Sequence, residues 1–153
     1  MTKVELVSEV FAPVKTVWNV LMEPAYVPKL YPNVITVEVD PPGRNRLGQK
    51  FHIVGRAGKR KLEIFSETVE LIEEKRTVNR QLPGGLFKSF TQVVTLEDKG
   101  MGTMVRTTFE YEISMGYIGK LFNVVLLERL VTDNLKAYNS ALKAICELIP
   151  LPE

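Results

Sequence analysis

Apolar and charged residues alternate at the start of the chain, and a helical spacing follows. The alternation over residues 3–11 predicts a strand, because successive side chains of a strand point to opposite faces. After Pro13, apolar residues recur at intervals of three, one and three positions, at Val14, Val17, Trp18 and Leu21. This spacing predicts a short amphipathic helix that starts at the proline. Further prolines interrupt the pattern, so we expect residues 24–31 to form a second, separate helical piece.

Strand-like alternation returns at residue 34 and recurs through the middle of the chain. Residues 34–39 carry Ile35, Val37 and Val39 on one face and end at a turn with two prolines and a glycine. Five further strand candidates follow, over residues 47–55, 60–73, 77–82, 87–96 and 103–115. Their connections, such as residues 55–58, 83–85 and 98–102, are too short for crossover helices. The sequence therefore predicts an antiparallel meander.

The last long segment has the most regular helical period. Its apolar residues recur every three or four positions, at Leu127, Val131, Leu135, Tyr138, Leu142, Ile145 and Ile149. Polar residues occupy the opposite face, so this pattern predicts a long amphipathic helix that ends before Pro150. Residues 121–127 are apolar on nearly every side. We expect that end of the helix to be covered from several sides or to contact a ligand.

The order of these elements predicts an α+β fold. One strand and two short helices precede six strands, and a long helix ends the chain. A long antiparallel sheet twists and coils, so a curved sheet of six to seven strands can wrap around the C-terminal helix. At 153 residues the chain is expected to form a single domain over residues 1–153.

Short motifs support the same arrangement. They are Phe11-Ala12-Pro13-Val14-Lys15-Thr16-Val17-Trp18, Glu23-Pro24, Tyr31-Pro32-Asn33-Val34 and Asn134-Leu135-Lys136. Together with the order of elements, they resemble the START and pollen-allergen-like helix-grip superfamily, which includes polyketide cyclase/dehydrase and lipid-transport proteins. The resemblance covers the whole chain. It implies a helix-grip fold and an apolar small-molecule ligand, lipid, polyketide or quinone-like, between the sheet and the C-terminal helix.

Charge and cysteine content limit the possible partners and compartments. The chain has 20 basic and 18 acidic residues, interspersed, with a net charge of +2, so nucleic-acid binding is not expected. One cysteine, Cys146, excludes an intramolecular disulfide, and its apolar neighbours predict a buried, inert thiol. The first residues lack the apolar core of a secretory signal, which favours a cytoplasmic location. Charged and polar residues interrupt residues 117–131, so we expect no integral membrane segment.

Two ionisable side chains are candidates for chemistry. His52 is the only histidine, so any catalytic Ser-His-Asp or Cys-His group would need it, and a site with several histidines is excluded. It shares a strand face with Lys50 and Val54, which favours a surface position over a place in a pocket. Arg80, if buried, would need a carboxylate or a ligand as partner; an exposed strand arginine is the simpler interpretation. We predict no metal and no cofactor.

Polar residues within the alternating strands are candidates for an inner wall. Phe90 and Gln92 share one face of their strand, and Thr107, Phe109 and Tyr111 share one face of the next. If these faces point inward, the polar groups need partners, which neighbouring side chains, water or ligand oxygens would supply. The candidate ligand-binding residues are therefore Gln92, Thr107, Tyr111, Phe90, Phe109, Arg80, His52, Leu121 and Val125.

Three functions fit these observations. The leading hypothesis is binding or transport of an apolar small molecule without catalysis, because no catalytic constellation is present in the sequence. The alternative is a polyketide cyclase or dehydratase, in which Tyr111, His52 or Arg80 polarises a carbonyl group. The third is a co-chaperone or ribosome-associated module that binds a partner through the outer sheet face or residues 117–127. The sequence predicts neither the ligand nor the oligomeric state.

Overall fold

The computed structural model describes residues 1–115 and 124–151. The first half of the chain forms β1 (Thr2–Val10), α1 (Val14–Met22), η1 (Pro24–Tyr26), α2 (Val27–Leu30), β2 (Val34–Asp40) and β3 (Lys50–Ala57). The second half forms β4 (Arg60–Ile72), β5 (Arg76–Gln81), β6 (Phe87–Asp98), β7 (Thr103–Ile113) and α3 (Val124–Leu148). These elements follow the predicted order.

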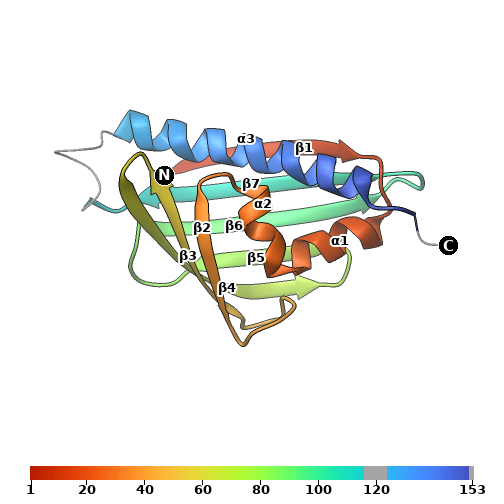
Figure 1. Ribbon diagram of the computed structural model, residues 1–153, viewed down its shortest axis with the longest axis horizontal. Coiled ribbons are helices and arrows are strands. Elements are labelled where there is room, and N and C mark those ends of the chain that lie inside the picture. The colour runs from red at the N-terminus through yellow and green to blue at the C-terminus, as the bar shows by residue number, and fades with distance from the viewer. Residues whose placement is uncertain (116–123, 152–153) are drawn as a thin grey trace.

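The strands form one antiparallel sheet with the order β1-β7-β6-β5-β4-β3-β2. Only β1 departs from the sequential order, because it pairs with β7 at the opposite edge from β2. The sheet is curved, and α3 runs along β1 and β7 across its concave side (Figure 1). Both short helices contact α3, α2 beside the β2 edge and α1 beside β6. The predicted α+β helix-grip fold is confirmed.

Two clusters of buried side chains hold α3 on the sheet. One lies at the α1 end and includes Trp18, Tyr138 and Cys146, each less than 2% exposed. The other is rich in aromatic residues, among them Phe87 and Phe109. Burial raises the pKa of Cys146 to about 12, with Glu147 adding to the shift, so the thiol stays protonated. The predicted burial of this cysteine is confirmed.

Two local details differ from the predicted pattern. The β3–β4 turn lies at residues 58–59, so the expected connection over residues 55–58 was placed too early. Gly55 belongs to β3, where a Cβ atom would lie 3.1 Å from the backbone oxygen of Asn33. In β2, a register shift between Val34 and Thr36 leaves Ile35 42% exposed, so Ile35 does not share the face of Val37.

No helix in the described part of the chain is long and apolar enough to span a membrane.

Candidate functional site

A cavity of about 200 Å³ lies between the inner face of the sheet, α2 and α3. Most of its wall is apolar. The apolar lining comes from α1, α2 and α3 and from strands of the sheet, and it includes Leu30, Phe51, Leu62, Phe90, Phe109 and Leu135. Residues of both buried clusters line the cavity, for example Leu30 of one and Phe109 of the other. The space between them is not filled by side chains.

A row of polar side chains crosses the sheet side of this cavity. Thr68 of β4 is paired in register with Asn79 of β5, and Asn79 is paired with Gln92 of β6. Asn79 and Gln92 line the cavity and are only half-buried, although they lie on central strands of the sheet. Because strand neighbours cover them on both sides, the surface that they keep faces the cavity.

The opposite wall carries two tyrosines. Tyr31 caps the C-terminal end of α2, where its backbone N–H donates to the oxygen of Val27 at 3.0 Å. Its ring stacks on Tyr138 of α3 with centroids 5.0 Å apart and planes 4° from parallel. Across the cavity, Nε2 of Gln92 donates a hydrogen bond to the Tyr31 hydroxyl at 3.1 Å. The hydroxyl of Tyr138 lies 3.2 Å from Oγ1 of Thr107, which is buried behind it.

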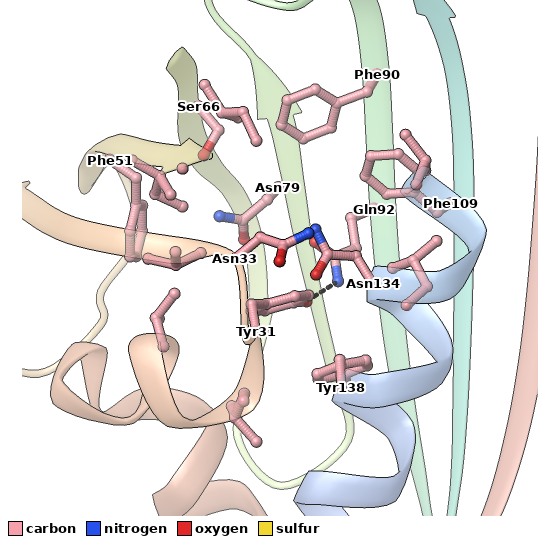
Figure 2. A pocket seen from close by; sticks show the side chains of 18 of the residues that line it. Tyr31, Asn33, Phe51, Ser66, Asn79, Phe90, Gln92, Phe109, Asn134 and Tyr138 are labelled. Carbon is pink, nitrogen blue, oxygen red and sulfur yellow. Dashed lines mark hydrogen bonds between the residues drawn. The ribbon is translucent and has the colours of Figure 1, made fainter. Parts of the chain in front are cut away.

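Four amide side chains gather around the Tyr31 hydroxyl. They are Asn33, Asn79, Gln92 and Asn134, here called the amide cluster, and Figure 2 shows them converging from the sheet, the start of β2 and α3. Arg56 is the one charged residue among the described residues that line the cavity. It is exposed, and strand alternation directs its side chain away from the inner face on which its neighbour Gly55 lies. The polar part of the site is therefore uncharged.

Burial keeps both tyrosines protonated. It raises the pKa of Tyr31 far above its usual value, and Tyr138 adds to this shift while the hydrogen bond from Gln92 opposes it. Burial also raises the pKa of Tyr138 to about 12, against the opposing hydrogen bond with Thr107. Both side chains are therefore neutral phenols at physiological pH, able to donate a hydrogen bond but not to act as bases.

The tyrosine pKa values predict a loss of stability at alkaline pH. Unfolded tyrosine releases its proton near pH 10, whereas folded Tyr138 holds its proton to about pH 12. The folded state then binds more protons, so this contribution to stability is complete below about pH 10 and is lost as the pH rises to about 12. Urea unfolding at pH 8–12 is expected to show this decline, with a shallower slope for Tyr138→Phe. An equal slope in both proteins would contradict it.

Three of the residues predicted for ligand binding line the cavity, namely Phe90, Gln92 and Phe109. Thr107 and Tyr111 lie on the inner face as expected, each 1% exposed, but neither belongs to the lining. Thr107 supports Tyr138 from behind. Tyr111 packs against Phe87 and Phe109, in the aromatic cluster.

Arg80 and His52 lie on the outer face of the sheet, away from the cavity. Arg80 is exposed, because alternation along β5 directs its neighbour Asn79 inward. Nε2 of His52 lies 2.9 Å from a carboxylate oxygen of Glu63, and its ring stacks on Phe65. Both residues therefore occupy the surface position that the sequence favoured, and neither belongs to the described lining of the cavity.

Within the described residues, the start of α3 does not contribute to the cavity wall. Val125 is 59% exposed and does not line the cavity, because it lies two residues, about 200°, around the helix from buried Leu127. Leu121 lies outside the described residues, as do residues 122 and 123 of the apolar segment 121–127 that we expected to be covered from several sides or to contact a ligand.

Sequence reasoning missed most polar residues of the wall, among them Tyr31, Asn33, Asn79, Asn134 and Tyr138. Signals for two of them were present. Asn134 and Tyr138 are four residues apart, so they share one helix face, and there Asn134 is a polar residue between the apolar Val131 and Leu135. A polar residue within a buried stripe indicates a partner or a cavity.

The fold is shared with several solved structures. An aromatase/cyclase, Zhui, from a Streptomyces species has a TM-score of 0.80 and 19% identity, over 95% of this chain and 93% of that one. A START superfamily protein from Mycobacterium smegmatis has a TM-score of 0.75 and 16% identity, covering 95% and 97%. Norcoclaurine synthase from Thalictrum flavum has a TM-score of 0.68 and 17% identity, covering 94% and 85%.

At these identities the likeness establishes the fold, and the sequence comparisons bear on the family. No curated protein sequence matches the chain. A family model described as polyketide cyclase / dehydrase and lipid transport matches residues 1–147. This match spans nearly all of the described elements, from β1 to the last turn of α3. The resemblance noted in the sequence is therefore confirmed, and the chain belongs to the polyketide cyclase / dehydrase and lipid transport family.

Proposed function

We propose that this protein binds an apolar small molecule in the cavity between the sheet and α3, with the polar group of the ligand held beside Tyr31 and Gln92. Family and fold support a hydrophobic ligand-binding or cyclase-like role. The observation that carries the binding proposal is an apolar cavity with an uncharged polar cluster inside it. Apolar walls favour transfer of a ligand from water, and the polar cluster orients it.

The hydrogen-bonding capacity of the cluster supports this proposal. Gln92 donates to the Tyr31 oxygen, so the Tyr31 hydrogen is directed elsewhere. Burying a polar group among apolar side chains costs free energy unless the group finds a hydrogen-bond partner. A ligand oxygen in the cavity would accept from Tyr31 and from nearby amide N–H groups.

Acid–base catalysis receives less support from the same residues. A cyclase or dehydratase of that type needs a proton acceptor or donor matched to neutral pH and within reach of the substrate. The described lining contains no Asp, Glu, His, Lys or Cys. Tyr111, His52 and Arg80, the candidates for such a role, lie outside the lining. The phenol and amide groups of the lining can hold and polarise a carbonyl group, but the described lining has no group suited to proton transfer at neutral pH. We therefore propose binding and orientation as the activity.

Native mass spectrometry of the freshly purified protein, followed by organic extraction, tests this function. We expect a bound small molecule that solvent releases, and saturable binding of toluene to the emptied protein. Toluene binding is followed by the backbone amide shifts of α2, β5 and β6, which line the cavity. The proposal is contradicted if no small molecule co-purifies with the protein and toluene binding does not saturate. A protein partner captured in a pull-down would then favour the interaction-module hypothesis.

A further inference from the structure

We infer that the ligand is a neutral molecule of about one ring in size, with an oxygen that accepts hydrogen bonds, such as a carbonyl group, and that the site rejects carboxylates. The inference rests on the proposed function, because it specifies what the same cavity accepts. Three features of the site support the inference independently: the volume of the cavity, its lack of an inward-facing charge, and its hydrogen-bond donors.

The volume of the cavity sets the size. A cavity of about 150 Å³ with apolar walls holds benzene in another protein, and pockets for drug-sized ligands are roughly 300–1,000 Å³. The cavity here measures about 200 Å³. It therefore accommodates one ring with a small substituent, and a fused polycyclic molecule would have to extend out of the open side of the cavity.

The charge of the ligand follows from the lack of an inward-facing charged side chain along the described lining. Along the described lining, Arg56 is the one charged residue, and its exposed side chain projects from the outer face of β3. A carboxylate that enters an apolar cavity loses its hydration, and without a cation nearby this loss is not offset. A neutral ring with a carbonyl group loses far less.

The donors at the site set the kind of polar group. The Tyr31 oxygen already accepts from Gln92 at 3.1 Å, so its own hydrogen is what remains to be offered. The side chains of Asn33 and Asn134 lie beside it in Figure 2 and carry further N–H groups. An acceptor oxygen at this point pairs with these donors, while the buried Oδ1 of Asn134 stays open to an N–H of the ligand.

These same donors would also reach a carboxylate, so their effect has to be weighed against the cost of burying the charge. Tyr31 provides the comparison, because its oxygen occupies this environment and receives the hydrogen bond from Gln92. Burial nevertheless raises the pKa of that phenol well above its usual value, which means that the surroundings disfavour an anion there despite the donor. A ligand carboxylate beside it meets the same surroundings.

Benzamide and benzoate test the inference, because they share a ring and heavy-atom number and differ in charge. Each is titrated into the emptied full chain at pH 7, and binding is followed by amide shifts, with toluene as the apolar reference. We expect benzamide to bind at least roughly tenfold more tightly than benzoate. We also expect apparent benzoate affinity to fall about tenfold per pH unit above its carboxyl pKa of about 4, whereas benzamide affinity stays constant.

The Tyr31→Phe variant supplies a second measurement. It removes the offered hydrogen and keeps the ring that stacks on Tyr138. We expect benzamide to bind roughly fivefold more weakly to this variant, and toluene to bind equally to both proteins.

Each other outcome has a defined meaning. Equal affinity for benzamide and benzoate at pH 7, without a pH dependence for benzoate, overturns the inference and leaves the proposed function standing. An equal loss of toluene and benzamide binding in Tyr31→Phe overturns the role of the hydrogen. Failure of all three compounds to bind overturns the proposed function and the inference together.

Discussion

Replacing Asn79 by phenylalanine is expected to abolish uptake of toluene and benzamide while the protein keeps its fold. Asn79 projects from the central strand β5 into the cavity, in the middle of the polar row. The cavity measures about 200 Å³, and the new ring occupies most of the space that one ligand ring requires. Binding should therefore weaken by roughly 100-fold or more, which a titration followed by amide shifts measures.

The stability of the Asn79→Phe variant separates blocking from unfolding. Thr68, which is fully buried, keeps a hydrogen bond of 2.8 Å to Asn45 when Asn79 is lost. Filling a cavity with an apolar side chain commonly raises the free energy of unfolding by about 0.5–2 kcal/mol. We therefore expect unchanged or higher resistance to urea together with the loss of binding.

Arg80→Phe is the matched control, because it makes the same change one residue along β5 on the exposed outer face. This variant is expected to bind both compounds like the parent protein. Toluene uptake by Asn79→Phe at the parental affinity would show that the ligand site is not this cavity.

The fold was predictable because its determinants are local. Alternation and helical spacing depend on neighbouring residues, so all seven strands and the described helical segments were located from period alone. The missed details depend on contacts between distant residues. Gly55 remains in β3 because the backbone of Asn33 lies against it, and no local pattern encodes that approach.

The candidate site was predictable only in part, since alternation alone does not say which face of a strand is inside. In β6 the apolar residues Phe90, Val94 and Leu96 share one face with Gln92, and Phe90 and Gln92 do line the cavity. In β5, the apolar residue of the strand is Val78, and it is 4% exposed on the outer face. Its cross-strand neighbour Val93 covers it there. A buried apolar residue on the outer face gives no sequence signal that Asn79, on the opposite face, points into the cavity.

The other missed residues depend on how the short helices meet the sheet. Tyr31 follows α2 and Asn134 lies on α3, and they meet Gln92 of β6 only after the whole chain has folded. In the sequence, Tyr31 and Gln92 are separated by 61 positions. A polar cluster of this kind has no short motif, because its members come from separate elements.

The turn between β5 and β6 contains Gly85 and leads directly into the cavity wall. The backbone N–H of Leu86 donates to the oxygen of Glu63 at 2.8 Å, and the N–H of Ser114 donates to the oxygen of Leu86 at 2.9 Å. Leu86 and Phe87 line the cavity directly after this turn. The segment is thus bonded to β4 on one side and to the end of β7 on the other.

Gly85→Ala is expected to lower the free energy of unfolding by about 3 kcal/mol or more. Gly85 has φ of +82°, a conformation that costs a residue with a Cβ atom roughly 1–2 kcal/mol. The added Cβ would also overlap the backbone oxygen of Glu63, and overpacking of a tight site typically costs about 1–3 kcal/mol more. Urea unfolding measures the loss.

Gly58→Ala separates these two costs, because Gly58 also has a positive φ, of +62°, but has no atom within 4 Å of an added Cβ. It should lose only about 1–2 kcal/mol, from the backbone conformation alone. Similar losses in the two variants would show that the contact with Glu63 does not hold the turn. A larger loss in Gly85→Ala, accompanied by weaker toluene binding, would show that this contact also shapes the cavity wall at Leu86 and Phe87, since relief of the overlap has to move the turn away from β4.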